Sequence, residues 1–288
     1  MRFVSLILFA ILAGALPAAA EVNTSEPPDV EARSEELLET ELPTTQHGYE
    51  LDISLRPKAS DVVKEDYIRM PIRVKYGITN NLEFSVTPQT YFANFFKGYF
   101  GLYMTDVALG TKYNYGETYP RSGIDMALSF KHIIPVRYDI RISDGYYHYI
   151  PAVLLSKRFG ELYFMGLGLG VDLVQGEGPP DSIQPNDTMF TSVSFSRHKD
   201  NTTYALETLF VTDEVYGGVT ESLLITPQAS LDVKNWLFDV PGIWTVSTGL
   251  RIGLLDAPKD FELLVRLNLH IRFDYKFDVM QMKLIKNT

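Results

Sequence analysis

Hydrophobic and polar residues alternate along most of the chain from about residue 49 onward. The pattern is clearest near the C-terminus, where every odd-numbered position from Leu263 to Phe277 is apolar or aromatic, while every even-numbered position from Arg266 to Lys276 is polar or charged. A period of two is typical of a β-strand whose two faces meet different surroundings. An α-helix would distribute these charges around its whole circumference, so the pattern excludes a helix here.

Twelve segments carry this pattern, eight of them strongly and four more weakly. The expected strands cover residues 49–56, 67–78, 82–89, 107–115, 124–131, 147–158, 163–173, 188–197, 202–212, 223–233, 244–253 and 263–277. Most are about ten residues long, the length that a tilted strand needs to cross a bilayer. We therefore expect an all-β fold, a single antiparallel up-and-down transmembrane β-barrel of about twelve strands.

The lengths of the connections provide an independent test. Mostly short, polar turns near residues 79–81, 116–122, 159–161, 198–201 and 234–241 alternate with segments near 57–66, 92–104, 135–146, 174–187, 213–220 and 255–260, most of which are longer. Bacterial outer-membrane barrels alternate short periplasmic turns with longer external loops in this way. The strand number is then even, and we expect both ends of the barrel on the periplasmic side.

A soluble β-sandwich also alternates, with its apolar face turned inward. Two features favour the inverted arrangement, in which the polar face is turned inward and the apolar face outward. The polar face combines Gly, Ser, Thr and Asn with charges of both signs, as a packed lumen requires, and aromatic residues gather toward strand ends, as in the girdles of membrane barrels. A secreted or periplasmic sandwich that acts as a binding module remains the alternative fold. Four prolines inside expected strands conflict with a closed barrel unless bulges hold them or the strand limits differ: Pro71, Pro88, Pro151 and Pro227.

The N-terminal region divides into two parts before the barrel. Residues 1–20 have the basic, apolar and small-residue regions of a secretory signal peptide. Residues 21–45 contain eight acidic residues and one basic one, which favours a flexible periplasmic segment, although a short helix near residues 30–42 is an alternative. The barrel is then expected to cover residues 46–288. The signal peptide predicts export, and the barrel predicts the outer membrane of a Gram-negative bacterium.

Composition narrows the classes of function. Most of the formal charge of −10 belongs to residues 21–45, and the chain lacks the clustered basic surface of a nucleic-acid binder. The absence of cysteine excludes disulfides, Cys-based metal sites, a thiol nucleophile and a lipidated N-terminal Cys. A mean hydropathy of −0.03 is compatible with a barrel, because only alternate residues face lipid.

Residues 73–83 read Arg-Val-Lys-Tyr-Gly-Ile-Thr-Asn-Asn-Leu-Glu and resemble the R-x-x-Y-G-l-T-x-x-L-E hairpin of transporter-like outer-membrane barrels. These include the family described as the outer-membrane component of phenol meta-pathway degradation. Gly101 to Tyr113 is similar to the G-x-x-D-v-x-L-G-x-K-Y strand of that family. The resemblance covers roughly residues 66–115 and implies a channel type, with outer-membrane lipid and the assembly machinery as partners. Such barrels commonly end on an aromatic residue, whereas this chain continues past Phe277 to Thr288, so either the assembly signal is internal or the chain is not inserted in this way.

An outward apolar face directs a set of charged residues into the lumen. The expected lumen-lining residues are Arg69, Arg73, Lys75, Glu83, Lys112, Asp125, Lys131, Asp172, Glu207, Asp232, Arg251, Arg266, His270, Arg272 and Asp274. These charges should pair, because unpaired buried charge is costly. They predict either a small pore that orients polar or anionic solutes or a salt-bridged plug that closes a structural barrel.

No motif points to catalysis. The five histidines are scattered and none lies in a Gly-x-Ser-x-Gly context, so we expect no enzyme and no cofactor, and no His pair has metal-ligand spacing. The glycines at 166, 168 and 170 have strand spacing and are expected to make room in the lumen for bulky neighbours. The expected partners beyond the membrane are small solutes, with no nucleic acid.

Overall fold

The computed structural model describes residues 37–58, 67–98, 101–119, 123–136, 144–160, 162–176, 185–213, 221–234, 243–255 and 261–272. The strands are β1 (Glu50–Leu55), β2 (Tyr67–Arg69), β3 (Ile72–Gly77), β4 (Leu82–Ala93), β5 (Leu102–Tyr119), β6 (Ile124–Pro135), β7 (Tyr147–Phe159), β8 (Tyr163–Gln175), β9 (Thr188–Lys199), β10 (Thr202–Asp213), β11 (Glu221–Lys234), β12 (Ile243–Leu255) and β13 (Phe261–Arg272). The described residues contain no helix long and apolar enough to cross a membrane.

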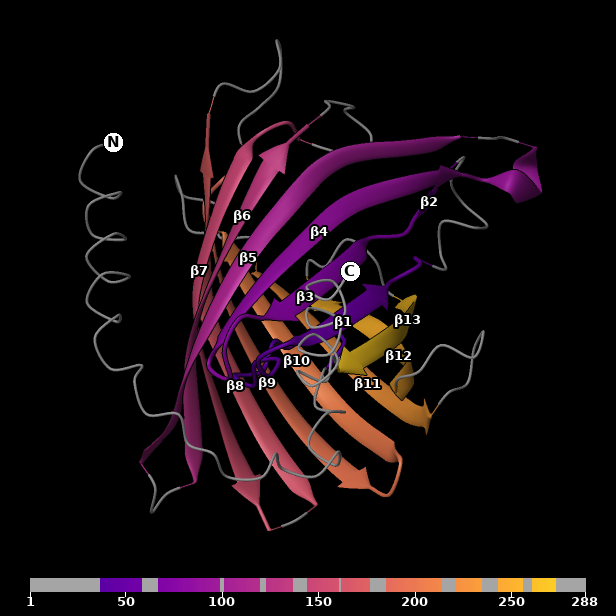
Figure 1. The fold of residues 1–288 in the computed structure, drawn as a ribbon. Coiled ribbons are helices and arrows are strands. Elements are labelled where there is room, and N and C mark those ends of the chain that lie inside the picture. The colour runs from indigo at the N-terminus through magenta and orange to yellow at the C-terminus, as the bar shows by residue number, and fades with distance from the viewer. Residues whose placement is uncertain are drawn as a thin grey trace, which may run out of the picture. The chain divides into compact units, whose positions relative to one another are not determined.

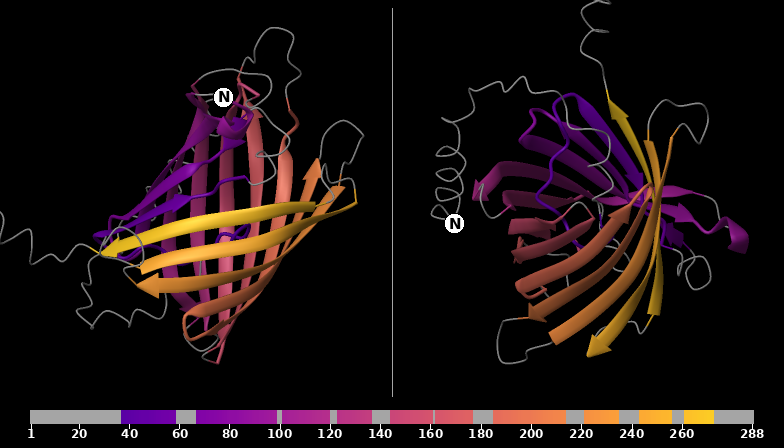
Figure 2. Two further views of the ribbon diagram at one scale, coloured as in Figure 1. Left: turned by 90° about the vertical axis from the view of Figure 1, so that its right-hand side faces the viewer. Right: turned by 90° about the horizontal axis from the view of Figure 1, so that it is seen from below.

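The strands form one closed antiparallel ring (Figures 1 and 2). β1 closes it by pairing with β13 along one edge and with β3 along the other. Every other strand of the ring pairs with its neighbours in sequence, so the ring has twelve members. The short β2 is the additional strand. It pairs with a more C-terminal part of β4 than β3 does. The prediction of a twelve-stranded up-and-down barrel is confirmed.

Both ends of the barrel sequence lie at the same end of the ring. Glu50, which begins β1, is the register partner of Arg272, which ends β13. The tight turn between β3 and β4 lies there too, because the Tyr49 amide donates to the Gly77 carbonyl at 3.0 Å. Both ends of the barrel sequence thus share the end of the ring that carries this turn, as an even strand number requires in an up-and-down barrel.

The structure resolves the conflict over the four prolines. Pro71 lies in the break between β2 and β3, and Pro88 lies beside a register shift in the β4–β5 ladder. Pro151 and Pro227 stay inside long strands, but each is paired on one side only: Pro151 with Phe130 of β6, and Pro227 with Leu206 of β10. Because proline has no N–H to donate, the ladder on its other side is interrupted without a change of register.

The burial of the two faces of β13 shows which face is turned toward the lumen. Leu263 exposes 49% of its surface, whereas Glu262, Arg266, Asn268 and His270 are buried. Large apolar side chains are also exposed on the outside of other strands, including Phe195 of β9 and Leu206 of β10. A sandwich would bury its apolar face, so the alternative of a soluble sandwich is wrong: the polar face turns inward and the apolar face outward.

The strand limits differ from the prediction at several places, including the β4–β5 hairpin and the C-terminus. β4 and β5 extend through much of residues 92–104, which we expected to be a loop, and a short 3₁₀ turn (Phe95–Lys97) joins them. The successive residues Leu102, Tyr103 and Met104 of β5 are all exposed, so alternation is lost on this side of the hairpin, although Asn94 directly after β4 is buried. At the C-terminus β13 ends at Arg272, and the expected continuation to Phe277 lies outside the described residues.

Candidate pore interior

The structure places the expected lumen-lining residues on the inner face wherever it describes their side chains. Lys75, Glu83, Lys112, Glu207, Arg266 and His270 are buried; Arg69, Arg73, Asp125, Asp172, Asp232 and Arg251 are partly buried; and Lys131 is exposed. Because Lys131 lies on the same face of β6 as the fully buried Ala127, its exposure indicates that the lumen is open to water at that point. The side chain of Arg272 and all of Asp274 lie outside the described part of the chain.

A stretch of the N-terminal region lies inside the barrel. We call residues 37–46 the strap. Its side chains Leu37, Leu38, Thr40 and Leu42 are buried, and its contacts reach β5, β10, β11, β12 and β13, which lie around the ring. Residues 37–45, which belong to the expected segment 21–45, are therefore held inside the barrel and form no helix; residues 21–36 lie outside the described residues. The strap leucines and backbone amides find partners in the lumen that a solvated linker would lack.

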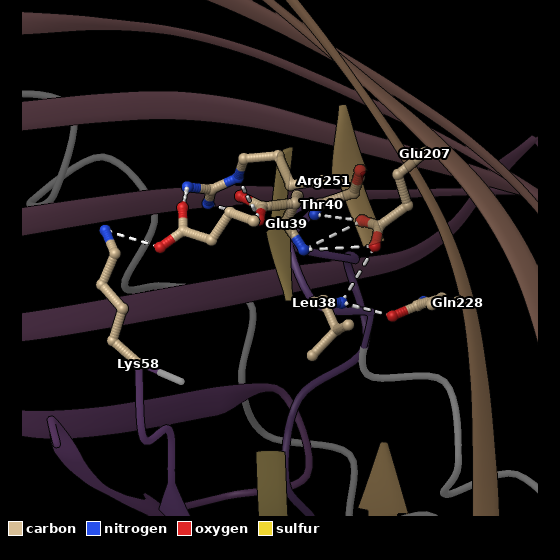
Figure 3. Close-up of polar contacts among 8 residues, drawn as sticks. Leu38, Glu39, Thr40, Lys58, Glu207, Gln228 and Arg251 are labelled. Atoms are coloured by element: carbon tan, nitrogen blue, oxygen red, sulfur yellow. Dashed lines mark hydrogen bonds and ion pairs between the residues drawn. The ribbon is translucent and has the colours of Figure 1, made fainter. Parts of the chain in front are cut away.

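One carboxylate on β10 holds the middle of the strap (Figure 3). Glu207 is fully buried and accepts hydrogen bonds from three successive backbone amides: from Leu38 at 3.0 Å, from Glu39 at 3.0 and 3.2 Å and from Thr40 at 2.5 Å. The Leu38 amide also donates to Gln228 of β11 at 3.0 Å. These bonds satisfy backbone donors that would otherwise be unpaired inside the barrel, and this is the reason that an irregular segment can lie there.

Basic residues hold two further positions of the strap, Leu37 and Leu42. The Arg266 guanidinium donates to the carbonyl of Leu37 at 2.8 Å, and Lys112 Nζ donates to the carbonyl of Leu42 at 3.2 Å. Lys112 also lies 3.6 Å from Glu83, whose carboxylate accepts the Gln46 amide at 2.9 Å. The lumenal charges thus pair partly with the strap and partly with one another. They pair because an unpaired charge is costly to bury.

A further charge cluster lies where the strap meets β12 and β13. Arg251 donates to Glu39 of the strap from Nε at 3.0 Å and from Nη2 at 2.5 Å, and to Glu262 from Nη1 at 2.8 Å. Lys58 pairs with the second oxygen of Glu262 at 2.9 Å (Figure 3). A cavity of about 350 Å³ lies beside this cluster and is lined in part by Arg56 and Arg69.

Glycines on the inner face make room for the strap. A Cβ at Gly166 would lie 2.6 Å from Leu42 Cδ2, and a Cβ at Gly249 would lie 2.7 Å from Leu38 Cδ1. A Cβ at Gly170 would meet the Phe190 ring. The interpretation that the glycines of β8 make room in the lumen is therefore confirmed.

Several residues of this interior were not identified from the sequence. Glu50 and Asp52 are buried on the inner face of β1, where a careful reading of the alternation Glu-Leu-Asp-Ile-Ser-Leu would have found them. Glu39 and Glu41 were assigned to a linker and Lys58 to a loop, whereas Arg56 was the last residue of an expected strand. For Glu39, Glu41 and Lys58 the sequence carries no signal, because their partners lie on strands far away in the chain.

The described residues show no group of His, Cys, Asp or Glu that could hold a metal ion. His148 pairs with Asp172 through Nδ1 at 3.0 Å and with Asp144 through Nε2 at 2.9 Å. Because both ring nitrogens face carboxylates, this histidine is held as an ion-pairing residue at the end of β7, an arrangement that differs from a Ser-His dyad.

No family model and no curated protein matches this sequence. Among solved structures, the chain is similar to the COG4313 outer membrane channel from Pseudomonas putida F1, with 12% identity and a TM-score of 0.53 over 86% of this chain and 100% of that one. It is similar to the NanC porin, with 12% identity and a TM-score of 0.52 over 77% of this chain and 100% of that one. At such identities the likeness concerns the fold: these structural neighbours are outer-membrane barrels of the channel and porin type, and the present chain has the same kind of closed antiparallel barrel.

Proposed function

We propose that this protein is a channel for small solutes across the outer membrane of a Gram-negative bacterium. The observation that carries the proposal is the inverted closed ring, with exposed apolar side chains outside and buried charges of both signs inside. An apolar exterior requires lipid, and a charged, partly water-accessible interior suits the passage of polar solutes. The channel fold of the structural neighbours supports the same proposal.

The sequence features complete this proposal. Residues 1–20 act as the signal peptide for export, and the outer-membrane assembly machinery inserts the barrel. The resemblance of residues 66–115 to the transporter-like barrels of the phenol meta-pathway type supports a place for this chain among such channels. The exterior residues then contact outer-membrane lipid.

The strap is the observation that favours the second candidate function, a non-conducting structural barrel. It lies across the lumen and is bonded to strands around the ring, so it narrows any passage. In a channel this means that the strap sets the resting conductance. In a structural barrel it would act as a permanent plug.

Conductance measurements distinguish the two candidates. We expect the purified full-length protein to migrate heat-modifiably on a gel and to give discrete conductance steps in a planar bilayer. A deletion of residues 37–46 should give larger steps. If neither protein conducts although both are folded and inserted, the barrel is structural and the proposed channel function is wrong.

A further inference from the structure

The cavity beside the strap has the composition of a binding site for an anion. Its volume is about 350 Å³, within the usual size range of small-molecule sites. Four cationic side chains line it, Arg56, Lys58, Arg69 and Arg251, against the carboxylates of Glu39 and Glu262. Among the described lining residues, four cations thus face two carboxylates, a composition that favours an anionic ligand.

Arg251 is the most informative member of this lining. Glu262 is its register partner on β13, so that pair belongs to the barrel wall. Glu39, in contrast, comes from the strap, and one of its oxygens accepts from both Nε and Nη2 of Arg251. An arginine that presents two donors side by side is the preferred partner of a carboxylate. The strap thus places its own carboxylate where the carboxylate of a solute could bind.

The remaining lining provides a second cation and an apolar surface. Arg56 Nε is buried and has no hydrogen-bond partner within the described part of the chain. Leu38, Tyr91 and Leu264 line the same cavity and can contact an apolar group. An inorganic anion such as sulfate would use the cations but leave this apolar surface and much of the volume unused.

We propose that this cavity binds a small organic carboxylate, whose carboxylate replaces that of Glu39 on Arg251 while its apolar body contacts Leu38, Tyr91 and Leu264. The strap is then a built-in competitor for the solute. This inference rests on the proposed channel function in one respect only, namely that the bound carboxylate is a solute that the channel transports. Binding itself does not require the barrel to conduct.

The test is calorimetric titration of the folded full-length protein in detergent at low salt, with benzoate as the probe. Benzamide has the same body without the charge, and sulfate has charge without the body. We expect benzoate to bind and to bind at least about tenfold more tightly than either, because hydrogen bonds to a charged group each contribute enough for such a factor. Equal heats from benzoate and benzamide, or no binding of benzoate, would overturn the proposal.

Variants assign the binding to this cavity. Glu39→Gln removes the competing carboxylate but keeps the backbone amide that Glu207 holds, so benzoate affinity should rise by about tenfold. Arg251→Lys keeps the charge but loses the paired donors and should weaken binding by about tenfold or more. Lys131→Gln removes a lumenal cation outside the cavity lining and should leave the affinity unchanged. If Lys131→Gln weakens binding as much as Arg251→Lys, the anion is held by the general lumenal charge and the site is wrongly assigned. A protein that conducts but fails these titrations retains the channel function without this site.

Discussion

Replacing Glu207 by Gln should release the strap while leaving the barrel folded. The Glu207 carboxylate accepts four N–H contacts from three successive amides, with both of its oxygens in use. Gln has nearly the same shape, but only one of its two terminal atoms is an acceptor. Its NH₂ group would point at backbone donors, so two of the four contacts are lost whichever way the amide is turned.

The expected loss follows from these contacts. Glu39 keeps one of its two contacts, so one amide, that of Leu38 or of Thr40, loses its bond to residue 207. A hydrogen bond to a charged group contributes about 1.5–3 kcal/mol, and the docking of the strap weakens by this amount. This corresponds to a change of about ten- to a hundredfold in the equilibrium between the docked and the released strap. The strand ladders of β9, β10 and β11 do not use the Glu207 side chain, and the barrel should therefore stay intact.

Cysteine labelling measures this release directly, since the natural chain has no cysteine. Leu42→Cys places a single thiol on the strap at a position that is now buried. With Glu207→Gln added, a water-soluble maleimide should label this thiol at least about tenfold faster, and single-channel conductance should rise.

Asp232→Asn is the matched control. This carboxylate also faces the lumen, but it accepts from Thr245 at 2.6 Å and from no amide of the strap among the described contacts. Labelling at position 42 and conductance should be unchanged in the control. If Glu207→Gln behaves like Asp232→Asn in both assays, the strap is not held by this carboxylate and the reasoning above is refuted.

Three further predictions concern the rest of the barrel. Gly166→Val introduces a Cβ 2.6 Å from Leu42 Cδ2, and we expect it to displace the strap at a cost of about 1–3 kcal/mol, seen as faster labelling of a thiol introduced by Leu38→Cys, which keeps Leu42 in place; unchanged labelling would show that the wall yields instead. Spin labels at Leu267 should relax with oxygen dissolved in lipid and labels at Asn268 should not, since their side chains lie on opposite faces of β13; equal relaxation would contradict the inverted arrangement. Lys131→Glu reverses a water-exposed lumenal charge and should shift the reversal potential in a salt gradient toward cation preference, whereas an unchanged potential would place residue 131 off the conducting path.

The sequence was informative about the strands because a barrel wall has a repeating environment. Every residue of a strand faces either lipid or lumen, so the period of two appears in the sequence itself. The predicted limits were wrong where this environment ends: at the start of β5, the successive residues Leu102, Tyr103 and Met104 are all exposed and alternation is lost. The prolines inside expected strands conflicted with a closed barrel only in the sequence. In the structure a missing N–H interrupts the ladder on one side of the strand and leaves the ladder on the other side intact, as at Pro151 and Pro227.

Only part of the candidate site could be predicted from the alternation along the strands. Lys75, Glu83 and Lys112 could be assigned to the lumen because they lie on the polar face of strands that alternate clearly. Glu39 could not, because it lies in an irregular segment whose chemistry resembles that of a solvated linker. Its position depends on partners that the sequence separates widely: Glu39 is 168 residues from Glu207 and 212 from Arg251.

By itself, then, the sequence determined an antiparallel barrel of twelve strands, its even strand number and the polar character of its inner face, since each of these follows from local alternation and connection length. Only the tertiary structure decided that residues 37–46 occupy the lumen. An acidic segment with a few leucines is equally compatible with solvent. It is held inside because Glu207, Arg251, Lys112 and Arg266, brought together by closure of the ring, supply at one place the partners that its backbone and carboxylates require.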